Sequence, residues 1–134
     1  MTVQWNPAAA IAAVRRKAVQ GVTAATALVE DASVQKITSG PKTGRTYRRN
    51  GVNHQASAPG EAPATDTGAL LASRRTEIEE NGLVGTLSYN TVYALDMERG
   101  NEKIAPRPYL QPSLEENRTE VKRLIASFIG GSRR

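Results

Sequence analysis

The stretch from His54 to Gly68, HQASAPGEAPATDTG, places the strongest limit on how this chain can fold. Pro59 and Pro63 each fix a backbone φ angle and remove an N–H donor, and each pushes the preceding residue toward extended geometry. Neither a helix nor a central strand is therefore expected here. A connection of this length is uncommon inside a compact domain and is usually functional or disordered. The alternative is that this stretch is a mobile surface loop with no function of its own.

The length of 134 residues fits one domain, 1–134, with a modest hydrophobic core. Aromatic residues make up only 4% of the chain, so this core must be built mainly from Leu, Ile and Val. A core with so few large side chains can depend on a partner surface to complete it.

The chain offers little for catalysis, because it has no cysteine and a single histidine, His54. Disulfides, thiolate metal sites, a cysteine nucleophile and a histidine zinc cluster are thereby excluded. Asp96 and Glu98, with Tyr93 alongside, are two residues apart on an expected helix, where their carboxylates point to different sides. No phosphate-binding glycine loop, nucleophile elbow or internal repeat is present. We expect no enzyme activity and no catalytic, cofactor or metal residues.

The net charge of +5 is unevenly distributed. Between Ala32 and Gly60 the chain has no acidic residue and five basic ones: Lys36, Lys42, Arg45, Arg48 and Arg49. A basic arm here can bind phosphates or pair with an acidic face of a neighbouring protein.

The chain shows no sign of a secretory signal or a membrane-spanning segment. The basic cluster at 15–17 follows the apolar N-terminal residues, which is the reverse of the order in a secretory signal, and no apolar run has membrane-spanning length. We expect a protein made in a cytoplasm, without a membrane partner.

Asn6 followed by Pro7 predicts the start of a long amphipathic helix that ends near Ala32 or as far as Lys36. Its apolar stripe is expected to contain Ile11, Val14, Ala18, Val22, Ala25 and Val29. A capping box of Ser113 and Glu116 predicts that the last helix starts after Pro112 and reaches Gly130. A short helical turn at 68–72 and a short helix at 91–99 are expected between them.

Two Asn-Gly pairs predict type I′ hairpin turns. Asn50-Gly51 joins extended runs at 45–49 and 52–56, and Asn81-Gly82 joins runs at 73–80 and 83–89. The first hairpin is polar on both faces and so buries little by itself. The expected fold is α+β: an antiparallel sheet packs against a long N-terminal helix and a C-terminal helix, and a hairpin and loop at about 40–66 protrude.

Four blocks of sequence carry a resemblance to a known family. They are HQASAPGEAP at 54–63, DTGAL at 66–70, Tyr93-Ala94 followed by Glu98 and Gly100, and APRPYL at 105–110 leading to Pro112 and Leu114. In this order and spacing, the chain resembles the small head-tail joining proteins of long-tailed, siphophage-type bacteriophages, also called tail-completion or neck proteins. Gly100-Asn101 and Pro108-Tyr109 stand where the family often has Gly-Thr and Pro-Phe, but both keep a turn and an aromatic.

The resemblance implies a structural virion protein that caps the tail tube as a ring, expected to be a hexamer, and joins it to the head connector. Its partners would be further copies of itself, the tail tube protein and the head-completion or connector protein, with non-specific contact to DNA in the lumen. It would be assembled in the cytoplasm of a bacterial host and reside in the neck of the virion.

The residues expected to contact a neighbouring subunit or the connector lie in the arm and the loop: Arg45, Arg48, Arg49, His54, Pro59, Gly60 and Pro63. We expect this region to become ordered on assembly. The alternative function is a nucleic-acid-binding module that uses the basic hairpin at 42–49.

Overall fold

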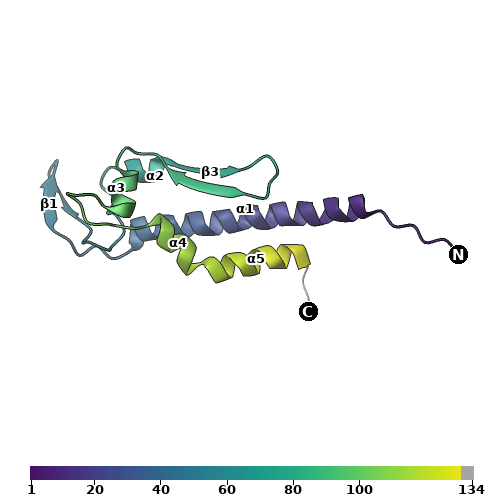
Figure 1. Cartoon of the computed structure of the whole chain (residues 1–134). Coiled ribbons are helices and arrows are strands. Elements are labelled where there is room, and N and C mark those ends of the chain that lie inside the picture. The colour runs from purple at the N-terminus through teal and green to yellow at the C-terminus, as the bar shows by residue number, and fades with distance from the viewer. Residues whose placement is uncertain (131–134) are drawn as a thin grey trace.

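The structure, a computed structural model, describes residues 1–130. Its elements are, in order, α1 (Pro7–Ser39), β1 (Thr46–Arg49), β2 (Val52–Gln55), α2 (Ala69–Ala72), β3 (Arg74–Ile78), β4 (Gly85–Tyr89), α3 (Ala94–Arg99), α4 (Leu110–Glu116) and α5 (Arg118–Gly130). Helix α1 forms the middle layer, with the β3–β4 hairpin on one side and α4 and α5 on the other (Figure 1). The α+β fold expected from the sequence is confirmed.

Helix α1 begins where the sequence predicted, because the Asn6 side chain accepts a hydrogen bond from the Ala9 N–H at 3.3 Å. It ends later than predicted, at Ser39. One face of the helix is buried at every fourth position: Gly21, Ala25, Val29, Ser33 and Ile37. The helix continues past Ala32 because Ser33 and Ile37 still face the interior of the protein.

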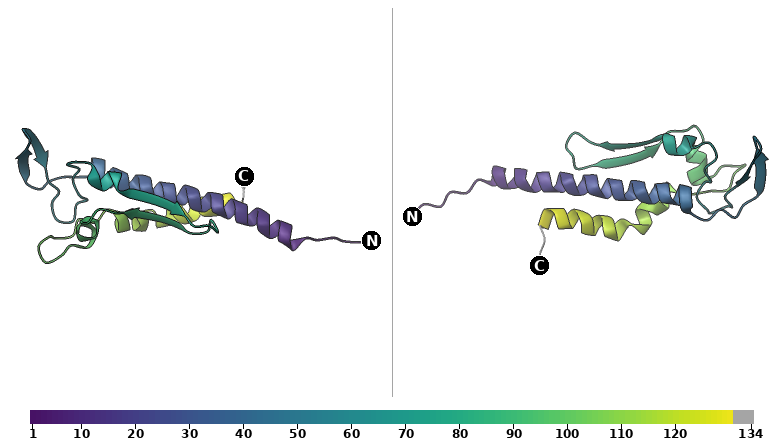
Figure 2. Two further views of the ribbon diagram at one scale, coloured as in Figure 1. Left: turned by 90° about the horizontal axis from the view of Figure 1, so that it is seen from above. Right: turned by 180° about the vertical axis from the view of Figure 1, so that it is seen from behind.

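The first three turns of α1 do not pack as the sequence predicted. Ile11 and Val14 belong to the expected buried stripe, but both side chains are mostly exposed. Close packing of α5 on α1 reaches Gly21, where an added Cβ would lie 3.1 Å from the Cα of Ile125. Helix α5 ends soon afterwards, and α1 projects beyond it and beyond the β3–β4 hairpin in every view (Figures 1 and 2).

Both Asn-Gly pairs lie in antiparallel hairpins, which form two separate two-stranded sheets. Asn50 and Gly51 have the positive φ values of a type I′ turn, +50° and +81°. The type I′ turn predicted at Asn81-Gly82 is wrong, because only Gly82 has a positive φ there and residues 80–83 form a wider loop closed by the Glu79–Val84 hydrogen bond. In β1–β2, Tyr47 pairs with His54 and nearly every residue is exposed, so this hairpin buries little, as expected. In β3–β4, Thr76 pairs with Leu87. The second hairpin is fixed to α1 through Glu30, whose carboxylate accepts hydrogen bonds from Arg74 at 2.8 Å and from Thr76 at 2.7 Å.

The C-terminal helix is two helices, separated at Asn117, and the predicted capping box is wrong. Ser113 is buried inside α4, where its hydroxyl donates to the Tyr109 carbonyl oxygen at 2.5 Å. Helix α4 starts earlier because Pro112, which lacks an N–H, is tolerated in the first turn of a helix. No membrane-crossing helix is found within residues 1–130, since none is both long enough and apolar enough.

The core lies at the C-terminal end of α1. It consists of Ile37, Leu70, Tyr89, Ala94 and Tyr109. The rings of Tyr89 and Tyr109 meet edge to face with their centroids 4.9 Å apart, a favourable aromatic geometry. The Tyr89 hydroxyl lies 2.7 Å from the hydroxyl of Ser33, so this buried polar group has a partner on α1.

Candidate interaction surfaces

The β1–β2 hairpin carries the arginines that the sequence singled out. Arg45 and Arg48 are exposed, and neither forms an ion pair within residues 1–130. Arg49 differs, because its guanidinium lies 2.5 Å from a carboxylate oxygen of Asp66. His54 stacks on Tyr47 and places its Nδ1 3.6 Å from the other Asp66 oxygen. Asp66 thus fastens the hairpin to the loop that follows it.

The rest of the basic run is also bound within the chain. Lys36 forms an ion pair with Glu116 at 2.6 Å, and the Lys42 ammonium donates to the Lys36 carbonyl oxygen at 3.0 Å. Burial lowers the pKa of Lys42, although the charge of Glu61 acts in the opposite direction. Only two of the five basic residues, Arg45 and Arg48, therefore remain available for an external anion.

The central loop is held to its own chain by Glu61. Its carboxylate accepts hydrogen bonds from the Thr43 hydroxyl at 2.6 Å, from the Thr43 N–H at 2.8 Å and from the Ala58 N–H at 2.8 Å. These bonds, the Thr43 hydroxyl foremost, lower the pKa of Glu61. The loop therefore has hydrogen-bond partners within its own chain, and the expectation that it becomes ordered on assembly stays a prediction.

Two further contacts tie the loop to the segment before α4. The Gly60 N–H donates to the Pro106 carbonyl oxygen at 2.9 Å, and the Arg107 guanidinium donates to the Ser57 carbonyl oxygen at 3.3 Å. Gly60 adopts a φ of +85°, which glycine tolerates without strain. Pro59 and Gly60 are exposed, whereas Pro63 is buried. Burial removes Pro63 from the surface that a neighbour can contact.

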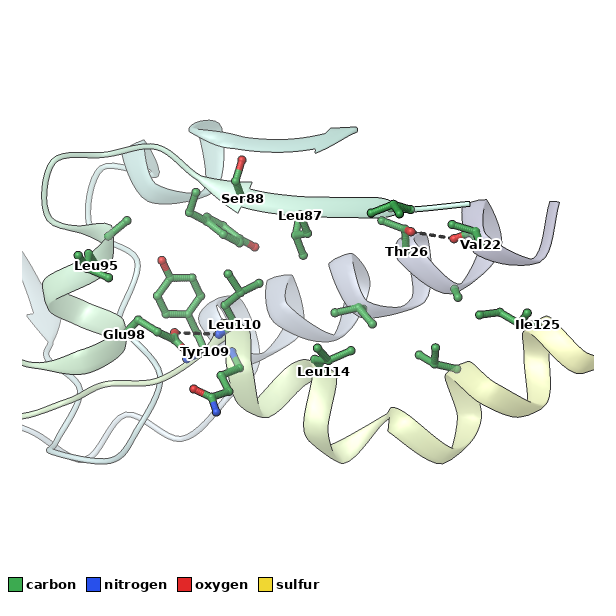
Figure 3. Close-up of a pocket in the computed structure, with 18 of the residues that line it drawn as sticks. Val22, Thr26, Leu87, Ser88, Leu95, Glu98, Tyr109, Leu110, Leu114 and Ile125 are labelled. Carbon is green, nitrogen blue, oxygen red and sulfur yellow. Dashed lines mark hydrogen bonds between the residues drawn. The ribbon is translucent and has the colours of Figure 1, made fainter. Parts of the chain in front are cut away.

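An apolar groove, which the sequence did not reveal, lies between β4 and helices α4 and α5. It has a volume of about 770 Å³. Strand β4 forms one wall, α4 and α5 form the other, and α1 lies behind them (Figure 3). Its apolar lining includes Val22, Val29, Leu87, Leu95, Leu114 and Ile125. Leu114 and Leu95 remain 44% and 59% exposed there, so the monomer leaves part of this lining uncovered.

Glu98 lines the groove beside Tyr109 and has a structural role. Its carboxylate accepts hydrogen bonds from the N–H groups of Tyr109, Leu110 and Gln111, at 2.7 to 3.0 Å. These are the donors that the start of α4 leaves without an intrahelical partner, and Pro112 contributes none. Burial raises the pKa of the neighbouring Tyr109 hydroxyl, and the charge of Glu98 adds to that effect. Glu98 therefore caps α4, and Tyr109 is part of the hydrophobic core.

Comparison of the chain with protein-family models, with curated proteins and with solved structures finds no match. Within residues 1–130, acidic and histidine side chains do not gather in groups of three or more that could hold a metal ion. The exposed arginines of the hairpin and the apolar groove are the surfaces on which we base a proposed function.

Proposed function

We propose that this protein is a structural joining protein of a long-tailed bacteriophage. It assembles into a ring at the head-proximal end of the tail tube, caps the tube and docks it onto the head connector. The observation that carries the proposal is the open apolar groove beside β4, because its partly exposed leucines Leu95 and Leu114 offer a surface that a second protein chain can cover.

The positions of the four sequence blocks in the fold support this proposal. The loop block contacts the APRPYL block through Gly60 and Pro106, and Glu98 caps α4, which starts at the last residue of that block. Leu70 from the DTGAL block and Tyr109 share one core cluster. Segments far apart in the sequence thus form one packed unit, which is a physical reason for the blocks to occur together.

The shape of the molecule also supports assembly into a ring. The groove begins at Val22 of α1, whereas the N-terminal part of α1 projects beyond the β3–β4 hairpin and α5 (Figure 2), so the two are different surfaces of the molecule. Contacts between two unlike surfaces are head to tail, and such contacts generate closed rings when the rotation closes. Arg45 and Arg48, on the hairpin at the opposite end from the N-terminus, are then free to meet an acidic face of the connector or tube.

Electron microscopy of phage particles assembled without this protein tests the function. We expect filled heads and tails that fail to join, or tails of irregular length, and joining restored when the wild-type chain is supplied. Complementation with the Val92→Ala variant is the control, and it should also restore joining, because the Val92 side chain is 99% exposed and lies outside the groove. Complete, infectious particles in the absence of the protein would rule the proposal out.

Nucleic-acid binding is the second candidate, and the exposed side chains of Arg45 and Arg48 favour it. Two phosphate contacts predict a slope of about −2 for log K against log salt, which is weak for a dedicated DNA-binding protein. The double variant Arg45→Ala/Arg48→Ala should then abolish a mobility shift that Arg15→Ala/Arg16→Ala retains. Binding of equal strength in the two double variants would exclude the hairpin as a DNA site.

A further inference from the structure

We infer that the segment Met1–Trp5 of one copy adds as a strand to the free edge of β4 in the next copy, and places Val3 and Trp5 in the apolar groove. The inference rests on the proposed function, because it specifies how neighbouring copies in the ring meet.

The segment before α1 has the pattern of a strand that lacks a partner. Its sequence, MTVQW, alternates apolar and polar residues, which is the period of a strand with one buried face. In the single chain all five side chains are exposed, and Trp5 is 79% exposed. The segment extends away from the rest of the molecule (Figures 1 and 2). The exposed Val3 and Trp5 side chains, which share one side of an extended strand, offer apolar surface that a partner can cover.

Strand β4 offers a free edge along the groove. Within residues 1–130 it pairs with β3 alone. The Glu79 N–H donates to the Val84 carbonyl oxygen at 2.9 Å, and residues of an antiparallel pair alternate in the direction of their backbone groups. Gly85 and Leu87 therefore point their N–H and C=O groups away from β3. A strand added at this edge would pair with those groups, as in the strand-addition mode of peptide recognition.

The groove beneath that edge suits the apolar face of the added strand. Leu87 of β4 and Leu114 of α4 line its opposite walls (Figure 3). Its volume of about 770 Å³ is in the range of cavities that take a ligand larger than one side chain. Val3 and Trp5 lie on the same side of an extended strand and so would enter the groove together.

A chain cannot place Trp5 in its own groove. Trp5 stands two residues before α1, and two extended residues span ~7 Å. Val22, the groove residue of α1 closest to the N-terminus, is fifteen residues into the helix from Pro7, or ~22 Å along its axis. A Trp5 side chain that enters a groove must therefore enter the groove of a second copy, and this is the head-to-tail contact that a ring needs.

Trp5 is the only tryptophan in the chain, so its fluorescence reports this contact directly. We would measure its emission maximum and the sedimentation of the full chain over the same concentration series. We expect the emission to shift to shorter wavelength as the oligomer forms. Leu114→Glu, a change at a partly exposed groove position, should abolish the emission shift and raise the dissociation constant of the oligomer at least tenfold. Val92→Glu, a change at an exposed position outside the groove, should leave the shift and the dissociation constant as in the wild type.

The outcomes separate this inference from the proposed function. An oligomer in which Trp5 remains solvent-exposed would overturn the inference and leave the ring intact. A groove that binds the tail tube protein, with binding lost in Leu114→Glu and Trp5 still exposed, would also overturn it, because the groove would then belong to another partner. A chain that stays monomeric throughout, even with its tail tube and connector partners present, would count against both.

Discussion

The two ends of α1 show how differently one helix can be used. At its C-terminal end, Ser33 and Ile37 are almost fully buried against the core around Tyr89 and Tyr109. At its N-terminal end, Ile11 and Val14 are mostly exposed, and this part of the helix projects beyond the β3–β4 hairpin and α5 (Figure 1). The apolar content of the two ends is similar, so the difference comes from what lies beside them.

This difference indicates where the fold gains its stability. Most of the stability of a protein helix comes from tertiary packing, and here that packing is concentrated in the half of α1 that follows Gly21. The N-terminal half is stabilised mainly by its cap and its alanines. It extends the molecule without contributing to its core, which suits a segment that serves assembly.

The largest predicted effect is in the core that packs against the C-terminal end of α1. Tyr109→Ala should lower the free energy of unfolding by about 3–5 kcal/mol, because it removes a side chain that is 1% exposed and leaves a cavity against Tyr89. Tyr109→Phe keeps the ring and should cost far less. Urea unfolding followed by circular dichroism measures both. If the alanine variant were within 1 kcal/mol of wild type, the core would not be centred here.

A smaller effect is expected at the cap of α4. Glu98→Ala removes the acceptor of three backbone N–H groups and should cost about 1–2 kcal/mol, the typical value for a lost helix cap. Glu102→Ala, at an exposed carboxylate outside these contacts, is the matched control. Equal unfolding midpoints for the two variants would show that Glu98 does not cap the helix.

The loop should respond to acid before the core does. The folded pKa of Glu61 is below its ordinary value of 4.5, so its ionised form stabilises the loop above pH 4.5. That stabilisation is lost as the pH falls through the lowered pKa. Hydrogen exchange of the Thr43 and Ala58 amides should therefore accelerate below pH 4.5, relative to amides of the core. In the Glu61→Gln variant, the Thr43 and Ala58 amides should exchange fast already at pH 7. Protected amides in that variant would contradict the role of the Glu61 carboxylate in holding the loop.

The smallest effect is expected at the projecting end. Ile11→Ser and Val14→Ser should each change the free energy of unfolding of the monomer by less than about 0.5 kcal/mol, as surface substitutions do. Thermal unfolding of the dilute protein measures this. A loss as large as that of Tyr109→Ala would mean that the two halves of α1 do not differ.

Local signals in the sequence predicted the elements well. Asn6-Pro7 marked the start of α1, and both Asn-Gly pairs marked hairpins, because caps and turns depend on a few adjacent residues. Ser113 was misread as a cap because the true cap of α4 is Glu98, which lies far before it in the sequence. A long-range contact of this kind leaves no pattern in the adjacent residues.

The candidate surfaces were predicted less completely. The exposed hairpin with Arg45 and Arg48 followed from its polar composition. The pairing of Arg49 with Asp66 and the burial of Pro63 could not be predicted, because they depend on how the loop folds back. The groove joins β4 with α4 and α5, and apolar residues on separate elements look the same in a sequence whether they meet or leave a gap.

Hydrogen exchange of the full chain, compared between the dilute monomer and the assembled ring, tests most directly the claim that assembly covers what the monomer leaves exposed. We predict strong new protection in residues 1–5 and in β4 at Gly85 and Leu87, with the already buried amides around Tyr109 unchanged. Protection that appears only in the β1–β2 hairpin, or nowhere, would contradict this account.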